Sequence, residues 1–200
     1  MPRASGRLTR PPPGVRLKKG VTVHVLALIG SPRKGGNTDI LVDELLGAAE
    51  ANGHVVGKVR LTELSIGPCR DCRACKHRED HSCVMDDDMT GLYSELELAD
   101  VIVFGTPIYW YGPTAQMKPM LDRLRAFSGT GKLRGKTSML VLPSQEGPSC
   151  CGPTVDMFAM IFRFLEMREG GAVLATAYDK GEVLGRPDDL ARARELGASL

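Results

Sequence analysis

The chain has 200 residues, of which 42% are hydrophobic and 25% are charged, and its formal net charge is +2. Residues 1–20 hold six basic side chains and no acidic one, so a total of +2 leaves −4 for the other residues. This mildly acidic remainder gives no support for nucleic-acid binding. The composition predicts a single globular domain with a substantial core.

The first twenty residues, "MPRASGRLTRPPPGVRLKKG", contain three consecutive prolines and few apolar side chains. Such a segment cannot offset its ordering entropy by burial, which predicts a disordered basic arm at 1–20 before a folded domain at 21–200. A transit peptide is the alternative for this arm. No apolar run reaches the length of a membrane span, and we expect a cytoplasmic protein without membrane contact.

From residue 21 onward, strand-like and helix-like segments alternate. Apolar, β-branched runs predict strands at 21–29, 54–61, 100–106, 136–143 and 171–178. Amphipathic spacing predicts helices at 38–52, 88–99, 113–127, 154–167 and 186–199. The alternation favours an α/β fold: a doubly wound, five-stranded parallel sheet of flavodoxin-like order 2-1-3-4-5, in a three-layer α/β/α arrangement. In such sheets ligands bind beyond the carboxyl ends of the strands.

The loop "GSPRKGGNT" at residues 30–38 joins the first strand to the first helix. A helix N-terminus presents unpaired backbone N–H groups and the positive end of its dipole, which favour a bound anion. Two consecutive glycines allow close approach of the backbone, and the loop offers polar donors from Ser31, Arg33, Asn37 and Thr38. The Gly-Lys-Ser/Thr signature of nucleoside triphosphate sites is absent. The alternative to a phosphate site is an ordinary helix cap with a glycine turn.

The loop after the third strand begins "GTPIYWYG" at residue 105. Pro107 restricts the turn, while Ile108, Tyr109 and Trp110 offer flat or apolar surface suited to a ring system. A buried aromatic turn is the alternative interpretation. Further along, at residues 122 and 123, an aspartate and an arginine predict a structural ion pair.

These two loops resemble those of the NADPH-dependent FMN reductase family. Residues 30–38 match its Ser-x-Arg-x-x-(Gly/Ser)-x-(Ser/Thr) phosphate loop, and residues 105–123 match its Gly-Thr-Pro-x-Tyr segment followed by Met-Lys and Asp-Arg. The resemblance covers roughly residues 22–180 and implies bound FMN. It implies phosphate ligands at Ser31, Arg33, Asn37 and Thr38, and contacts along the isoalloxazine edge from Pro107, Ile108, Tyr109, Trp110 and Gly112. In the loop at 143–153, Ser144, Gln145, Glu146 and Gly147 are expected near the pyrimidine side of the flavin.

Four cysteines, Cys69, Cys72, Cys75 and Cys83, lie in the motif "CRDCRACKHREDHSC". Overlapping two-residue spacings bring three thiolates onto one loop, as a [4Fe–4S] cluster requires, and the motif resembles that of the iron–sulfur flavoproteins, a branch of the same family. Zinc is a second interpretation. A third is a loop without metal, followed by "DDM", whose basic residues stabilise thiolates or bind the phosphate of a nicotinamide cofactor.

The resemblance implies an FMN-dependent oxidoreductase that passes a hydride from NAD(P)H to FMN and then electrons to a quinone, flavin, nitro compound or redox partner. No catalytic acid or base is assigned. Two alternatives remain open: an iron–sulfur flavoprotein or flavodoxin-type electron carrier without NAD(P)H turnover, and a redox sensor or partner-binding protein acting through the cysteine loop. The unusually apolar helix at 154–167 predicts deep burial or a subunit interface, and we expect a homodimer or homotetramer.

Overall fold

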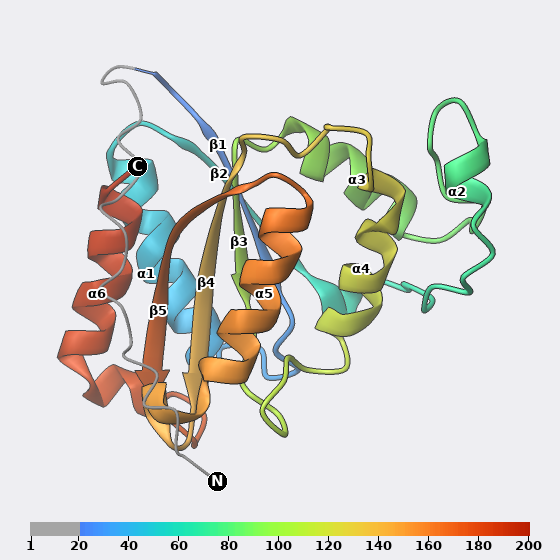
Figure 1. The fold of residues 1–200 in the computed structure, drawn as a ribbon. Coiled ribbons are helices and arrows are strands. Elements are labelled where there is room, and N and C mark those ends of the chain that lie inside the picture. Colours follow the sequence, from blue (N-terminus) through green and yellow to red (C-terminus); the bar gives the residue numbers. More distant parts are fainter. Residues whose placement is uncertain (1–20) are drawn as a thin grey trace, which may run out of the picture.

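The computed structural model describes residues 21–200, so the prediction for residues 1–20 lies outside the described residues. Its five strands form one parallel sheet in the order β2-β1-β3-β4-β5, which confirms the predicted fold class (Figure 1). The strands are β1 (His24–Ile29), β2 (Val55–Arg60), β3 (Val101–Gly105), β4 (Thr137–Ser144) and β5 (Arg168–Thr176).

Helices cover both faces of the sheet, as the predicted three-layer arrangement requires. One layer holds α1 and α6, and the opposite layer holds α3, α4 and α5 (Figure 1). The long helices are α1 (Asn37–Ala51), α3 (Met89–Leu98), α4 (Met117–Arg123), α5 (Gly152–Phe164) and α6 (Pro187–Ala198). A short helix, α2 (Ala74–His77), lies in a loop that projects from this body (Figure 1). Within residues 21–200, every helix is too short or too polar to cross a lipid bilayer.

The sheet separates two hydrophobic cores, because successive side chains of a strand point to opposite faces. In β1, Leu26 and Leu28 join the core beneath α3, α4 and α5, whereas Ala27 and Ile29 join the core beneath α1 and α6. Nearly every residue of β1, β3 and β4 is buried. Burial on both faces is the reason why these strands read as continuous apolar runs in the sequence.

An aromatic cluster fastens α5 to the sheet. The ring of Phe104 in β3 lies 5.4 Å from that of Phe158 and 5.3 Å from that of Phe162, between ring centroids. All three side chains are buried. Full burial of each such side chain stabilises the fold by about 2–3 kcal/mol, so the inner face of α5 is well fixed.

The helix predicted at 113–127 is shorter than expected and starts later. The α-helix begins at Met117, and residues 124–127 continue it as a tighter 3-10 turn. Pro119 falls in the first turn, where a missing N–H costs no hydrogen bond, so the proline moves the start of the helix instead of bending its middle.

Candidate functional site

The phosphate loop, residues 30–36, curls between the end of β1 and the start of α1. The Arg33 amide donates to Ser31 Oγ at 3.2 Å, and the Gly36 amide donates to the Arg33 carbonyl at 3.0 Å. Gly35 has a φ of +66°, and a Cβ on Gly36 would lie 2.9 Å from the Arg33 carbonyl oxygen. Both glycines are therefore required by this tight turn. The turn leaves the first amides of α1 without intrahelical partners, as an anion site needs.

The carboxyl ends of the strands bring several loops around a cavity of about 180 Å³. Four of the predicted site residues that line it come from the segment at 30–38: Ser31, Arg33, Asn37 and Thr38. Pro107, Ile108 and Tyr109 of the second loop and Ser144 and Gln145 of the third also line it. The structure thus brings together nine of the thirteen predicted cofactor contacts. Trp110, Gly112, Glu146 and Gly147 do not line this cavity.

The loop after β5 also reaches the cavity, although the sequence patterns did not predict contacts from it. Ala177 and Tyr178, just beyond β5, line it together with Pro143. The available signal was that every strand of a parallel sheet ends at the same edge, so the loop after β5 belongs to the same search.

The loop after β5 is bonded directly to the phosphate loop. Arg33 Nη1 donates to the Tyr178 carbonyl at 2.7 Å, and Asn37 Nδ2 donates to the Asp179 carbonyl at 2.8 Å. Asn37 Oδ1 also accepts from the Val183 amide at 3.2 Å. The Asn37 side chain is therefore held at both ends, and its backbone amide and the second N–H of Nδ2 remain as donors for an anion. Arg33 keeps further N–H donors on its guanidinium.

The second loop is a tight hairpin with two aromatic residues at its tip. Tyr109 and Gly112 exchange backbone hydrogen bonds of 2.9 and 3.1 Å, and the tip residues Trp110 and Tyr111 have φ angles of 50° and 61°. Left-handed backbone at a bulky residue costs about 1–2 kcal/mol, so the surroundings must hold this turn. Thr154 at the start of α5 does so by donating to the Tyr111 carbonyl at 2.8 Å. The Trp110 side chain is 97% exposed.

The base of this hairpin is tied to the phosphate loop through Thr114. Thr114 Oγ1 donates to the Gly30 carbonyl at 2.6 Å, and the Thr114 amide donates to Thr106 Oγ1 at 3.1 Å. Both threonines are fully buried. The walls of the cavity are thus held in register by hydrogen bonds shielded from water.

The third loop is shaped by Gly147. Its φ is +67°, and a Cβ there would lie 2.2 Å from Thr176 Oγ1. Ser144 Oγ donates to the Gly147 carbonyl at 2.8 Å, which turns the loop back toward α5. Cys150 and Cys151 follow as two free thiols. Burial raises the pKa of the Cys151 thiol to about 11.

The cysteine loop, residues 68–86, holds its four cysteines as free thiols, with Cys72 exposed and the others half-buried. Burial, and next the neighbouring Cys83, raise the pKa of the Cys75 thiol, while the Arg125 guanidinium lowers it. In the part of the chain that the structure describes, no three Cys, His, Asp or Glu side chains are grouped to hold a metal ion. As this loop stands, the four thiols are not drawn together as the ligands of a [4Fe–4S] cluster or zinc, and the metal site stays a prediction.

The two ends of the cysteine loop are joined by an ion pair between the buried Arg123 and the half-buried Asp87. Arg123 Nη1 and Nη2 donate to the two carboxylate oxygens of Asp87 at 2.8 and 3.1 Å, and Nη1 also donates to the Gly67 carbonyl at 3.0 Å. The Gly67 amide donates to Asp87 at 3.0 Å. Burial opposes ionisation, but the hydrogen bonds from Arg123 and Gly67 hold the pKa of Asp87 below its ordinary value.

This geometry corrects the ion pair predicted between Asp122 and Arg123. Asp122 instead accepts from Lys118 at 2.6 Å, one turn earlier on α4, while Arg123 pairs with Asp87. Adjacent residues on a helix point in different directions, so they do not face each other as residues four apart do.

Comparison with known proteins agrees with this geometry. The model of the NADPH-dependent FMN reductase family matches residues 23–179. The chain belongs to the NADPH-dependent FMN reductase family. Within it, the chain is 31% identical to an iron–sulfur flavoprotein of Methanocaldococcus jannaschii over 183 residues, which is 88% of this chain and 94% of that protein. It is 25% identical over 182 residues to a Bacillus subtilis protein assigned as an NAD(P)H-dependent FMN-containing oxidoreductase, with 87% and 96% of the two chains covered.

A solved structure has the same fold. The NAD(P)H:quinone oxidoreductase from Methanothermobacter marburgensis superposes with a TM-score of 0.69 at 15% identity, over 89% of this chain and 96% of that chain. The predicted FMN reductase family, its iron–sulfur flavoprotein resemblance and the flavodoxin-like fold are confirmed. This FMN reductase family member is an oxidoreductase, as predicted.

The cavity of this FMN reductase family member has the donors that FMN needs. The buried Ser31 and Thr38 line it together with Arg33, beside the unpaired amides at the start of α1. The apolar Pro107 and Ile108 lie toward the second loop. Polar donors for a phosphate and flat apolar surface for a ring thus share one cavity, and this set fits the cofactor of the family.

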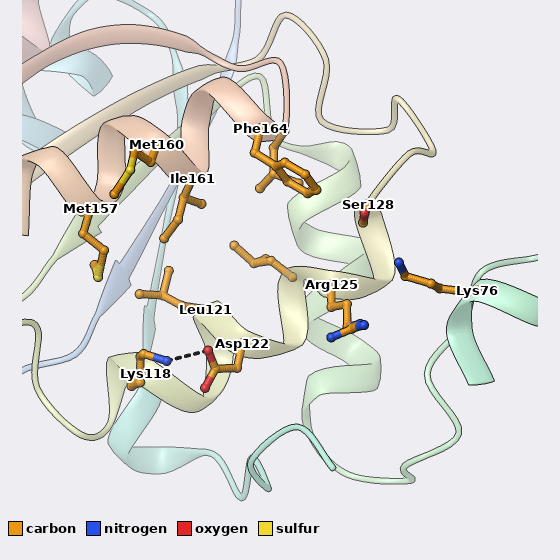
Figure 2. Close-up of a pocket in the computed structure, with 12 residues that line it drawn as sticks. Lys76, Lys118, Leu121, Asp122, Arg125, Ser128, Met157, Met160, Ile161 and Phe164 are labelled. Carbon is orange, nitrogen blue, oxygen red and sulfur yellow. Dashed lines mark hydrogen bonds and ion pairs between the residues drawn. The ribbon is translucent and has the colours of Figure 1, made fainter. Parts of the chain in front are cut away.

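A second hollow of about 670 Å³ lies between α4 and α5 and shares no lining residue with the first cavity. Figure 2 shows Leu121 of α4 facing Met157 and Ile161 of α5, with Lys76 and Arg125 at the end near α2. Phe164 and Met160 are 70% and 62% exposed. The apolar helix predicted at 154–167 is therefore divided: its inner face is buried against the sheet and its outer face borders an open groove.

Proposed function

We propose that this chain binds FMN at the carboxyl edge of its sheet and oxidises NAD(P)H, passing the electrons to a quinone, flavin, nitro compound or redox protein. The observation that carries this proposal is the meeting of the phosphate loop, the aromatic hairpin and the third loop around one cavity. Segments far apart in the chain supply the two halves of one ligand site, polar for a phosphate and apolar for a ring.

The phosphate would be held by the first turn of α1 and its loop. Ser31 and Thr38 offer hydroxyl donors, the Asn37 backbone offers an amide, and Arg33 offers a charge-assisted hydrogen bond. The Tyr178 carbonyl keeps the Arg33 side chain beside the cavity before any ligand arrives, since it already accepts from Nη1. Little ordering entropy then remains to be lost on binding.

The flavin ring would lie between the second and third loops. Pro107, Ile108 and Tyr109 form one wall, and Ser144 and Gln145 offer polar atoms on the other side. Trp110, Gly112, Glu146 and Gly147 remain predicted contacts around the rim. When bound, FMN supplies the hydride and electron transfer between NAD(P)H and an acceptor, and the chain supplies binding, orientation and exclusion of water.

The test is FMN titration followed by steady-state kinetics. FMN added to the apoprotein should lose fluorescence at a stoichiometry of one per chain, and the complex should oxidise NADPH or NADH in the presence of a quinone. Binding without turnover above background would replace the reductase by a flavodoxin-type electron carrier. Failure of the folded apoprotein to bind FMN would overturn the proposal.

A cluster on the cysteine loop is a second candidate function, supported by the spacing of the four cysteines and by the iron–sulfur flavoprotein among the relatives. It would require the loop to draw Cys69, Cys72, Cys75 and Cys83 closer together than they lie here. Anaerobic reconstitution with iron and sulfide tests it: a broad absorbance beyond the flavin bands, lost in Cys69→Ser and Cys72→Ser, is expected for a cluster. Unchanged flavin spectra and no bound iron would leave a thiol loop for redox sensing or partner binding.

We also propose a homo-oligomer formed through the groove between α4 and α5. Phe164 projects beside a hollow on the same face, and a two-fold interface needs such a self-complementary patch. Light scattering should show a dimer or tetramer that Phe164→Glu dissociates, while Arg163→Ala, exposed on the same helix but outside the groove, should not. A monomeric wild type would remove this proposal. The cytoplasmic location stays a prediction.

A further inference from the structure

A buried carboxylate lies directly beneath the phosphate loop. Asp39 is the third residue of α1 and is 1% exposed. Its Oδ2 accepts the Gly35 amide at 2.6 Å and forms an ion pair with Arg60, and its Oδ1 lies 3.6 Å from Lys58 Nζ. No hydrogen bond to Oδ1 is made within residues 21–200. An acidic side chain next to the predicted phosphate ligands is unexpected, because a phosphate is itself negatively charged.

The two cations come from the edge strand β2, which lies next to β1 in the sheet. Lys58 and Arg60 are two residues apart, so they share the face of β2 that carries Val56 into the core with α1. This placement turns both side chains toward the start of α1. The charge of the buried carboxylate is thereby compensated by two cations, as burial of an ion demands.

Electrostatics alone makes this carboxylate unfavourable for the proposed function. It follows directly on Asn37 and Thr38, whose amides would bind a phosphate dianion, and like charges at short range repel. Its geometry, in contrast, favours the loop. Asp39 reaches back from the first turn of the helix to an amide that precedes the helix, much as the acidic member of a capping box does. The amide that it holds belongs to Gly35, the residue with left-handed backbone.

We propose that Asp39 is a positioning residue for the phosphate loop: by holding the Gly35 amide it fixes the turn that aims the amides of α1 at the phosphate of FMN. Arg60 and Lys58 fix the carboxylate in turn. The consequence is selectivity for the phosphorylated flavin, because riboflavin uses the ring walls of the cavity but not the loop. This inference rests on the proposed FMN function and adds a residue that does not itself touch the cofactor.

The experiment compares the dissociation constants of FMN and riboflavin by fluorescence titration. Asp39→Ala should weaken FMN binding about tenfold, since a charge-assisted hydrogen bond and the order of the loop are lost, and should leave riboflavin binding within twofold. Asp39→Asn keeps an acceptor oxygen for Gly35 and should weaken FMN about threefold. The matched control is Asp43→Asn, one turn further along α1, which removes an equal charge that pairs with Lys58 on the surface.

The outcomes separate positioning from charge. Tighter FMN binding by both Asp39→Asn and Asp43→Asn would mean that charge alone matters, and it would overturn the proposal. Equal weakening of FMN and riboflavin by Asp39→Ala would indicate a merely structural role and would also overturn it. If Asp39→Ala does not fold by circular dichroism, the near-isosteric Asp39→Asn decides alone through its FMN-to-riboflavin ratio. A wild type that fails to bind FMN contradicts the proposed function instead, so the two failures are distinguishable.

Discussion

The phosphate loop and the cysteine loop are both irregular segments beside the sheet, but the first is tied to many parts of the chain and the second to few. Residues 30–36 bond to Thr114, Tyr178 and Asp39, which lie on three other elements or loops. Residues 68–86 make hydrogen bonds only within themselves in the described part of the chain, apart from an ion pair of 2.7 Å between Asp71 and Arg125.

This difference shows which site is formed in advance. A segment held by bonds to several distant elements keeps one shape with or without its ligand, and little entropy is lost on binding. A loop joined to the body mainly at its base can adjust to what it binds, because it has few buried apolar contacts. The cysteine loop also projects away from the rest of the molecule (Figure 1).

The largest expected effect comes from breaking the base of the cysteine loop. Arg123→Met leaves Asp87 with a half-buried charge and no guanidinium, and breaking such a pair costs about 3 kcal/mol of unfolding free energy. Urea denaturation measures the loss. Because the folded-state pKa of Asp87 is lowered, the pair stabilises the wild type above the unfolded-state pKa, and this contribution is lost as the pH falls through the folded-state value. Arg123→Met should therefore lose less stability than the wild type between pH 7 and pH 3; an equal loss would contradict this assignment.

The thiols of the cysteine loop and of the third cavity loop should differ next most strongly. At pH 8, a thiol with a pKa of about 11 is ionised to only about one part in a thousand, and Cys151 is also fully buried. Brief alkylation followed by peptide mass spectrometry should modify the exposed Cys72 first and leave Cys151 unmodified until the protein unfolds. Early labelling of Cys151 in folded protein would mean that the third loop, which borders the same cavity as the phosphate loop, is not rigid.

Arg33→Ala should reduce FMN affinity by about ten- to a hundredfold, the value of one hydrogen bond to a charged group. Riboflavin affinity should be unaffected, since that ligand has no phosphate. Lys34→Ala is the control, because Lys34 is the neighbouring cation and its side chain is 82% exposed. Equal losses in both variants would point to general charge and not to a specific phosphate ligand.

The smallest effect is expected at the other ion pair of α4. Lys118 and Asp122 have side chains that are 53% and 44% exposed, and exposed pairs of this spacing stabilise a helix by about 0.3–0.5 kcal/mol. Lys118→Ala should therefore lower the midpoint of urea denaturation only slightly. A loss as large as that of Arg123→Met would show that exposure does not distinguish the two pairs.

The local hydrophobic pattern of the sequence was sufficient to predict the fold, because each strand and helix is encoded by neighbouring residues. The continuous apolar runs of β1, β3 and β4 reflect burial on both faces, and the alternation of strands with helices permits few arrangements. The glycines and hydroxyls at residues 30–38 likewise report a strand-to-helix turn that any chain with this fold must make. Nine of the predicted contacts consequently line one cavity, although their contact with FMN stays a prediction.

The sequence by itself determined the order of elements, the family and the position of the phosphate loop, since each depends on residues close together in the chain. The tertiary structure alone decided the partners of charged side chains: Arg123 with Asp87, Asp39 with Arg60, and Arg33 with the Tyr178 carbonyl. Such pairs join residues 21 to 145 positions apart, and many alternative partners of the same charge exist in the sequence. Only the packing of the strands and helices brings one particular partner within hydrogen-bond distance and removes the water that would otherwise compete.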